Sequence, residues 1–346
     1  MLMAIHGSFN GKWQAFELGS VSVRMYAFEL VTTEIRYRLI PLLSSVADPG
    51  CLESNLPVSK IAAAFDLASQ LSAERALAPS TIIWKIKRLL NVGSEKKLKE
   101  AIKLVNELAE TMINQRREMG FSNKNDLLSR FMTSINDEKY LRDIIVSFLL
   151  AGRDTVAAAL TSFFWLLSQN PRVESSIRDE LNKIMGSNQE LVSFDVLSNM
   201  HYLSAAIHES MRLFPPVQFD SKFAQEDDIL PDGTFISKGT RVTYHPYAMG
   251  RMERIWGPDC TEFKPERWLK NGRFVPESPF KYPVFQGGLR VCLGKEMALV
   301  EMKCVAIAVI RKFNIRVADP NQAPRFAPGL TATVRGGLPV MVKKIN

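Results

Sequence analysis

The residues best suited to chemistry in this sequence form one ten-residue stretch, from Phe285 to Gly294, which reads FQGGLRVCLG. Its three glycines favour backbone conformations that other residues resist, and they let another group approach the backbone closely. Cys292 lies just before a helix that we expect to begin near Lys295, and the N–H groups at a helix start favour a thiolate over a thiol. A thiolate in such a loop, two residues after Arg290, suits an iron ligand on the face of a macrocycle whose anionic substituent the arginine would meet.

Two plainer interpretations of Cys292 stay open on the residues alone. A lone cysteine is usually a small buried apolar residue. It could instead be a nucleophile paired with a histidine, but none of the four histidines lies in a recognisable protease motif; they are His6, His201, His208 and His245. The remaining cysteines, Cys51, Cys260 and Cys304, lack the spacing of a zinc module or a disulfide framework.

A second group of polar residues interrupts a long apolar segment that runs from residue 144 to residue 170. Crossing a bilayer takes about 20 apolar residues, and the charged pair Arg153 and Asp154 at the midpoint would be costly there. We therefore expect a buried helix of a soluble domain. Gly152 weakens this helix by about 1 kcal/mol relative to Ala, and a local bend would free the Thr155 hydroxyl; otherwise that hydroxyl bonds to the preceding turn.

The elements that position these residues are expected to be mainly helical. Residues 1–213 and 296–313 are largely helical in pattern, residues 219–248 and 314–346 indicate short strands, and residues 249–294 form an ordered loop. The clearest helices are expected at 95–118, 140–168, 172–185 and 194–213. The sequence predicts one domain, mainly α with small β-sheets.

Composition excludes several classes of protein. The chain has 346 residues, of which 46% are hydrophobic and 23% charged, as expected for a globular chain rather than a disordered one. Its net charge of +8 is compatible with nucleic acid, an anionic membrane surface or an acidic partner. The basic residues are dispersed and no nucleic-acid fold signature is present, so nucleic acid is not an expected partner. The first seven residues resemble neither a signal peptide nor a membrane anchor.

The pattern F-x-x-G-x-R-x-C-x-G, formed by Phe285, Gly288, Arg290, Cys292 and Gly294, resembles the haem-ligand loop of the cytochrome P450 monooxygenases. Three further motifs stand in the order of that family: AGRDT at 151–155, the E-x-x-R pair Glu209 and Arg212, and PERW at 265–268. The segments 247–257 and 328–339 are similar to the plant branch that oxidises fatty-acid chains at or near the ω end, and to its subgroup that also oxidises jasmonoyl-isoleucine.

The resemblance implies a role for each matching residue. Cys292 would be the axial ligand of haem b iron, Arg290 would contact a haem propionate, and Phe285, Gly288 and Gly294 would shape the loop. The carboxylate of Glu209 would be held by two guanidiniums, those of Arg212 and Arg267, as a rigid organiser behind the haem. Thr155 and Asp154 would be the catalytic pair that manages protons while oxygen is activated. Substrate contacts are expected from Val217, Phe219, Leu330 and Thr331.

The same resemblance implies partners and a location. Electrons would come from NADPH through a reductase, the substrate would be a small fatty-acyl molecule, and the protein would be a monomer on the cytosolic face of the endoplasmic reticulum membrane.

The chain also departs from the family at its N-terminus, which we expect to be truncated. The anchor, the first sheet and a segment that roofs the haem are not recognisable, and Trp13 is followed by Glu17 where the family has W-x-x-x-R. An alternative interpretation is therefore a non-catalytic relative with impaired haem binding, acting at most as a binding protein.

Overall fold

The computed structural model describes residues 14–18 and 60–345, apart from residues 77, 122–125, 187–191, 322–323, 328 and 336. Trp13, which the family pattern singles out, lies outside the described residues. Helices dominate. They are α2 (Lys60–Ala76), α3 (Thr81–Leu90), α4 (Gly93–Glu118), α5 (Leu127–Ser134), α6 (Glu138–Gln169), α7 (Pro171–Met185), α8 (Phe194–Asn199), α9 (His201–Leu213), α10 (Pro246–Met249), α11 (Glu253–Trp256) and α12 (Lys295–Lys312).

The strands are short and pair in small antiparallel sheets, so the expected mainly α class with small β-sheets is confirmed. They are β1 (Gln14–Leu18), β2 (Asp220–Phe223), β3 (Asp228–Ile229), β4 (Phe235–Ile236), β5 (Arg241–Tyr244), β6 (Leu269–Lys270), β7 (Arg273–Phe274), β8 (Phe313–Val317), β9 (Phe326–Ala327), β10 (Thr333–Val334) and β11 (Leu338–Lys344). Three 3₁₀ turns complete the description: η3 (Pro265–Trp268), η4 (Pro283–Phe285) and η5 (Gly288–Arg290).

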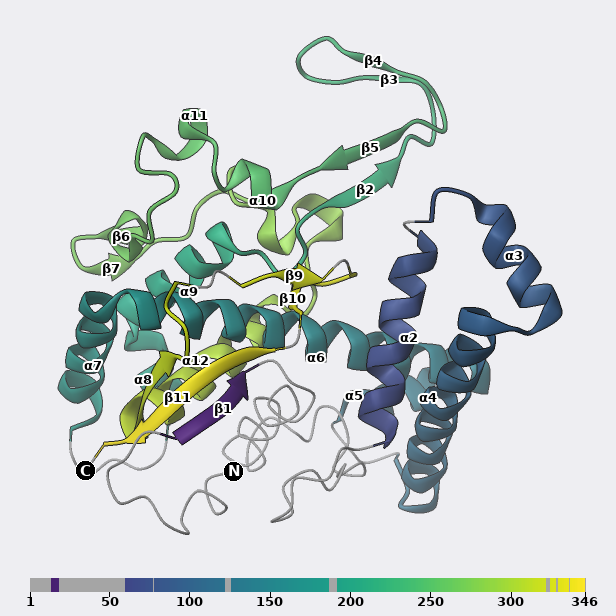
Figure 1. The fold of residues 1–346 in the computed structure, drawn as a ribbon, viewed down its shortest axis with the longest axis horizontal. Coiled ribbons are helices and arrows are strands. Elements are labelled where there is room, and N and C mark those ends of the chain that lie inside the picture. Colours follow the sequence, from purple (N-terminus) through teal and green to yellow (C-terminus); the bar gives the residue numbers. More distant parts are fainter. Residues whose placement is uncertain are drawn as a thin grey trace.

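Helix α6 runs through the middle of the molecule and organises the core (Figure 1). Asp137 caps its start by accepting from the N–H groups of Lys139 and Tyr140, and Asn170 followed by Pro171 ends it. Within the described part of the chain, α6 is the one helix long and apolar enough to cross a membrane. It packs against α4, α9, α12 and β8, burying side chains such as Phe163 that each contribute about 1.5–3 kcal/mol. We therefore assign it to the core.

The segment expected as one helix over 194–213 is two helices, because the chain breaks at Met200. The carboxylate of Glu180 in α7 accepts from the N–H groups of Tyr202 (2.7 Å) and Leu203 (2.9 Å). These are donors that the first turn of a helix leaves unpaired. A residue on a neighbouring helix thus caps α9 at a position where its own sequence offers no cap.

The prediction of a largely helical chain over 1–213 is wrong at Gln14–Leu18, which form strand β1. This strand pairs antiparallel with β11, with Phe16 opposite Val340, and β11 in turn pairs with β8. Strand β1 depends on a partner at the other end of the chain, and five residues give little local signal for either structure.

The β-rich part at 219–248 folds as a long ribbon that projects from the helices (Figure 1). Strands β2 and β5 form its base, with Asp220 opposite Tyr244, and β3 and β4 form its tip. The tip turns at Gly233, whose φ of +88° lies in the left-handed region that glycine enters without strain. The ribbon leaves the helices after α9 and returns the chain to them at α10.

Candidate functional site

The loop from Phe285 to Gly294, here called the cysteine loop, presents an exposed thiol at the start of α12. The N–H of Cys292 donates to the carbonyl of Phe285 (2.8 Å), which closes the loop upon itself. Gly288 has a φ of +63°, and Gly294 is the residue before the first turn of α12. The loop therefore holds the thiol at its surface, next to the positive end of a helix dipole.

The side chains around Cys292 are apolar and face outward. Leu289 and Leu293 are almost completely exposed, and Val291 is exposed as well, whereas Phe285 packs against the main core. Arg290 is exposed at the end of η5. Exposed aliphatic side chains around a thiol form a surface suited to a flat apolar ligand.

Behind this loop, the structure brings Glu209, Arg212 and Arg267 together. Both oxygens of the completely buried Glu209 carboxylate accept from Arg212, through Nε and Nη2 at 2.8 Å each. Arg267 Nε, from η3, donates to Glu209 Oε1 at 2.8 Å. Trp268 Nε1 (2.8 Å) and the backbone N–H of Lys264 (3.0 Å) complete the set. The carboxylate is thus fully compensated, as a buried charge must be.

The other N–H groups of Arg212 donate hydrogen bonds to the segment that follows α10. Arg212 donates to the carbonyls of Gly250, Cys260 and Glu262, and its guanidinium lies 5.0 Å from the ring of Trp256. A Cβ at Gly250 would overlap the carbonyl oxygen of Arg212, so a glycine is needed there. One arginine on α9 therefore fixes the course of residues 250–262.

Ion pairs extend this network to the surface. Asp259 contacts Arg267 (3.2 Å) and Lys264 (2.8 Å), and the hydrogen bond from Lys264, with that of Arg267, lowers the pKa of Asp259 to about 2. Burial opposes protonation of Arg267, yet the charge of Glu209 and its hydrogen bond raise the pKa of Arg267. Asp259 and Arg267 are therefore both charged at neutral pH.

His208, next to Glu209 in the chain, belongs to the same assembly although no motif marked it. Its Nδ1 lies 2.8 Å from the carbonyl of Ser204, and its ring lies 4.5 Å from that of Phe274. The Tyr282 hydroxyl donates to the His208 carbonyl (3.2 Å). Burial lowers the pKa of His208 to about 4, so the imidazole is neutral at pH 7. Its place in the H-E-x-x-R run was the one signal available.

On α6, Asp154 and Thr155 point to different surroundings. Asp154 is buried, lies 3.2 Å from Arg153 Nη1, and lines a cavity of about 10 Å³ beside Thr333, enough for about one water molecule. Arg153 also contacts Asp66 of α2 (2.9 Å). The Thr155 hydroxyl donates to the carbonyl of Ala151 (2.6 Å), the bond that a helical threonine makes with the preceding turn.

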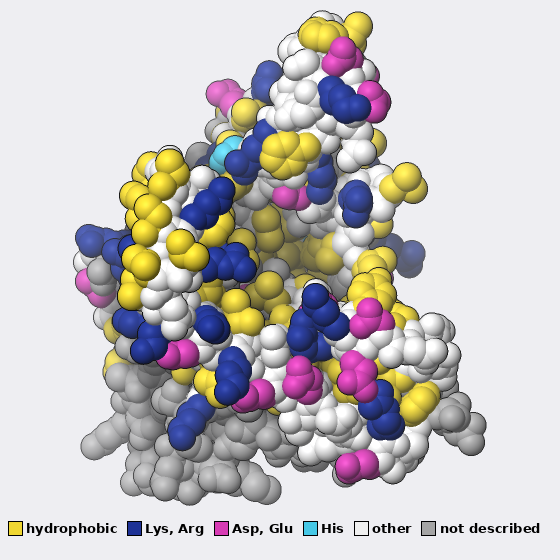
Figure 2. Space-filling model, turned by 90° about the vertical axis from the view of Figure 1, so that its right-hand side faces the viewer, with side chains coloured by type: hydrophobic (Ala, Val, Ile, Leu, Met, Phe, Trp, Pro, Cys, Tyr) yellow, Lys and Arg dark blue, Asp and Glu magenta, His cyan; other side chains and the backbone are white. Residues whose placement is uncertain are grey.

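The residues expected to contact substrate come from two segments that lie side by side. The N–H of Ala332 donates to the carbonyl of Pro216 (2.7 Å), which joins the segment of Leu330 and Thr331 to that of Val217 and Phe219. The Phe219 ring lies 5.3 Å from that of His245, while Leu330 is exposed. Figure 2 shows that the face carrying α3 and the ribbon is hollowed, with hydrophobic side chains inside the hollow.

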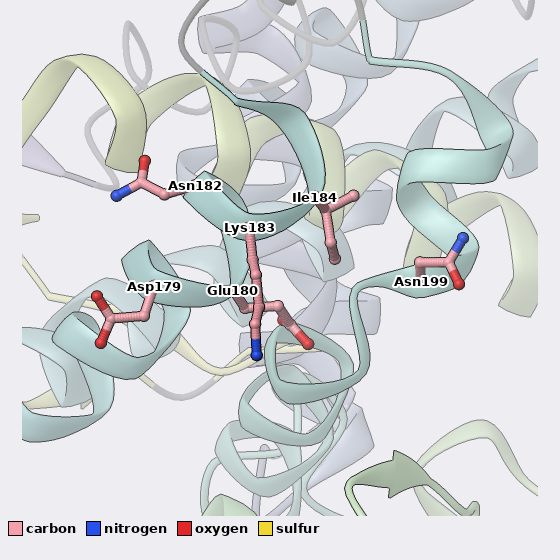
Figure 3. A pocket seen from close by; sticks show the side chains of 6 residues that line it. All are labelled: Asp179, Glu180, Asn182, Lys183, Ile184 and Asn199. Carbon is pink, nitrogen blue, oxygen red and sulfur yellow. The ribbon is translucent and has the colours of Figure 1, made fainter.

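A larger open cavity, of about 650 Å³, lies far from these residues in the fold. It is lined by Asp179, Glu180, Asn182, Lys183, Ile184 and Asn199, where α7 meets the end of α8 (Figure 3). Its lining is mostly charged or amide, and α7 stands on the opposite side of the molecule from α3 (Figure 1). Its position and polarity make it unsuited to an apolar substrate.

The donor set fits a haem better than a bare metal ion. Among the residues that the structure describes, no three His, Cys, Asp or Glu side chains gather to hold an ion. A bare ion takes most of its ligands from protein, whereas haem iron takes most from the macrocycle and needs one axial donor from the chain. Cys292 carries the one exposed thiol among the described residues, next in sequence to exposed aliphatic side chains, and it meets that requirement.

Comparisons with known proteins concern the sequence and the fold of the chain. The sequence model of the family described as Cytochrome P450 matches residues 57–342. Cytochrome P450 94C1 of Arabidopsis thaliana is 57% identical over 97% of this chain and 75% of its own length. Cytochrome P450 94A1 of Vicia sativa is 42% identical over 97% and 72%. The structure titled retinoic acid bound cyanobacterial CYP120A1 has a TM-score of 0.76 at 24% identity, covering 97% of this chain and 70% of that one.

Proposed function

Because the chain belongs to the cytochrome P450 family of monooxygenases, in its plant 94 subgroup, we propose that it inserts one oxygen atom of O2 at or near the ω end of a fatty acid or a fatty-acid conjugate such as jasmonoyl-isoleucine. The observation that carries the proposal is the exposed Cys292 thiol in a glycine-rich loop at the start of α12. The hydrophobic hollow on the face that carries α3 and the ribbon supports an apolar substrate chain (Figure 2).

In this proposal the chain binds haem b through its own side chains. Cys292 would supply the thiolate that holds the iron, Arg290 would pair with a propionate, and Phe285, Gly288 and Gly294 would shape the loop. When bound, haem supplies the activation of O2 that makes attack on an unactivated C–H bond accessible. The Glu209, Arg212 and Arg267 assembly holds the backbone behind the loop rigid.

In the same proposal, Asp154 and Thr155 of α6 take part in proton transfer. Asp154 is buried beside a cavity of single-water size, so a water molecule there could exchange a proton with its carboxyl group. The Thr155 hydroxyl, donating to Ala151, keeps its lone pairs free to accept a hydrogen bond. Val217, Phe219, Leu330 and Thr331 would contact the substrate chain and orient it.

Electrons would come from an NADPH-dependent reductase to a monomeric protein on the cytosolic face of the endoplasmic reticulum membrane. Helix α3 supports a membrane location. Its apolar side chains are exposed along its whole length, at Ile82, Ile83, Ile86, Leu89 and Leu90, and Lys85, Lys87 and Arg88 alternate with them. A basic amphipathic helix of this kind binds the surface of a bilayer that contains anionic lipids.

The test of the proposal is a carbon monoxide difference spectrum. The full chain, expressed with a haem precursor and reduced with dithionite, is expected to give the Soret band of a thiolate-ligated carbonyl complex. Cys292→Ala should abolish that band, whereas Cys304→Ala, which removes a buried thiol of α12, should retain it. Absence of the band in the wild-type chain would instead support the alternative of a non-catalytic relative with impaired haem binding.

The substrate is tested by turnover with a reductase. Lauric acid and jasmonoyl-isoleucine are offered to the reduced, haem-loaded protein, and the position of the new hydroxyl is read by mass spectrometry. Product at or near the ω end of either compound supports the proposal, and oxidation of neither would contradict the proposed substrate class while leaving the haem assignment intact.

A further inference from the structure

Gln286, the second residue of the cysteine loop, has a backbone conformation that only glycine adopts freely. Its φ is +62° and its ψ is −173°. A side chain in this region is strained, and such strain persists only where the surroundings hold it in place. Glycines follow at 287 and 288, so the sequence places a glutamine at a position where glycine would be easier. The side chain of Gln286 should therefore have a use.

That side chain is held by the base of the ribbon. Gln286 Nε2 donates to Asp220 Oδ2 (2.6 Å), and Gln286 Oε1 accepts from Lys222 Nζ (3.1 Å). Lys222 Nζ also donates to Asp220 Oδ2 (3.0 Å), and the hydroxyl of Tyr244, across the β2–β5 pair, donates to the same oxygen (3.2 Å). We call Asp220, Lys222, Tyr244 and Gln286 the sheet clamp.

The sheet clamp is charge-assisted. Partial burial acts to raise the pKa of Asp220, but hydrogen bonds from Lys222, the Ser221 backbone and Gln286 outweigh it and lower that pKa. Burial and the Asp220 charge raise the pKa of Tyr244 to about 12, which keeps its hydroxyl a donor. Hydrogen bonds to an ionised carboxylate are stronger than those between neutral groups.

The sheet clamp acts on the peptide unit that receives the Cys292 N–H. The carbonyl of Phe285 belongs to the peptide bond that leads into Gln286, and it accepts from the Cys292 N–H at 2.8 Å. The N–H of the same peptide unit donates to the carbonyl of Pro283 (3.0 Å). Fixing the Gln286 side chain thus fixes the orientation of the acceptor that anchors Cys292.

We infer that Gln286 is a positioning residue for the Cys292 thiol, and that the sheet clamp is the device through which the β2–β5 sheet holds the cysteine loop in its strained conformation. The inference rests on the proposed function for its consequence, which is the geometry of the thiolate at the iron. It does not rest on that function for the structural link itself, which can be measured without haem.

The first experiment is hydrogen–deuterium exchange on the full chain, read on peptides that contain the Cys292 amide. Gln286→Ala removes the sheet clamp and leaves the strain, so exchange there should quicken by about tenfold or more. Gln286→Gly removes both, and should quicken it less than Gln286→Ala but remain faster than wild type. Ser221→Ala, on the same strand but bonded to Thr243 across the sheet, is the matched control and should leave the rate unchanged.

The second experiment reads the iron. In haem-loaded protein, Gln286→Ala and Asp220→Ala should shift the reduction potential and shorten the lifetime of the thiolate-ligated carbonyl band. Asp220→Asn, which keeps an acceptor oxygen, should lie between Asp220→Ala and wild type. If the sheet clamp only stabilised the fold, these substitutions would lower thermal stability without shifting the reduction potential.

The outcomes separate the two claims. If wild type never shows the thiolate-ligated band, the proposed function fails, and the exchange measurement still decides on the sheet clamp. If Gln286→Gly protects the Cys292 amide as well as wild type does, or if neither alanine variant alters exchange or potential, the inference is overturned.

Discussion

At the residue scale, Glu209 shows how a buried charge becomes an organiser. Both of its oxygens are occupied by donors from α9, η3 and the backbone at Lys264. Removing only this negative charge leaves the buried Arg212 guanidinium without a counter-charge and leaves Arg267 with Asp259 alone. An unpaired buried charge costs more free energy than the intact ion pair contributes to stability.

We therefore expect Glu209→Gln to lower the free energy of unfolding by about 3–5 kcal/mol. Glu262→Gln makes the same chemical change at an exposed residue, whose backbone carbonyl, but not its side chain, accepts from Arg212. Its free energy of unfolding should stay within about 0.5 kcal/mol of the wild-type value. Urea denaturation followed by circular dichroism measures both. Equal losses in the two variants would contradict the organising role.

His208 gives the fold a pH dependence whose sign follows from its lowered pKa. Between pH 6.5 and about 4 the unfolded chain binds a proton at this residue and the folded chain does not. Stability contributed by the neutral ring is therefore complete above pH 6.5 and is lost as pH falls toward 4, by up to about 3 kcal/mol.

His208→Phe keeps the packing against Phe274 and removes the titration. The variant loses the bond to Ser204 at every pH, but the slope of its unfolding free energy between pH 6.5 and 4 should be flatter than that of wild type. His245→Gln, which removes an exposed histidine, is the control for the loss of a histidine elsewhere in the chain. Urea midpoints at pH 7.5, 6 and about 4.5 give the comparison, and parallel slopes in all three proteins would exclude His208 as the titrating group.

Sequence reasoning reached part of this site because part of it is local. The spacing of Glu209 and Arg212 puts them on one face of a helix whatever the fold is. The bonds from Trp268 and Lys264, the aromatic enclosure of His208 and the bond from Gln286 to Asp220 all join residues more than fifty positions apart. Nothing in a local window carries such contacts.

At the element scale, the break between α8 and α9 shows one helix controlling another. Glu180 of α7 supplies the acceptors for the first turn of α9, whose last turn carries Arg212. The position of the organising network is thus set from both ends of α9.

Glu180→Ala should destabilise the protein by about 1–2 kcal/mol, the usual cost of a lost helix cap. Amide exchange at Tyr202 and Leu203 should accelerate before exchange in the rest of α9. Asp179→Ala is the matched control, because Asp179 lines the same open cavity without bonding to α9 (Figure 3). Protection that is unchanged at these two amides would show that another group caps the helix.

Helix α9 also shows the limit of locating helices and strands from the sequence. Periodicity located α4, α6, α7 and α12 to within a few residues, because an apolar stripe and its end signals lie within one segment. It joined α8 to α9, since the cap comes from α7, and it gave no hint of β1, since the partner is β11. Elements that are defined by a distant partner leave no mark in their own residues.

At the scale of the whole molecule, two distant segments expose apolar side chains on one face. Helix α3 has no buried residue, and the ribbon carries exposed Phe223, Ile229 and Phe235. Figure 2 shows both on the hollowed face, with basic side chains around the helix. If the protein binds a membrane through this face, as proposed, an apolar substrate dissolved in the bilayer would reach the hollow from the lipid side.

This arrangement predicts membrane binding that depends on α3. The full chain should sediment with vesicles that mix neutral and anionic phospholipid. The double variant Ile86→Glu, Leu89→Glu should lower the vesicle partition constant by about tenfold or more, because two apolar side chains are lost and negative charges are added that the anionic lipid repels. Phe194→Ser removes an equally exposed apolar side chain from α8, away from α3, and should bind as wild type does. Raising the salt concentration should also weaken the binding of the wild-type protein to these vesicles, because salt screens the attraction of Lys85 and Lys87 to anionic lipid. Binding that survives the double substitution would place the lipid contact elsewhere on the molecule. It would also contradict the hypothesis that the membrane and the substrate approach the same face.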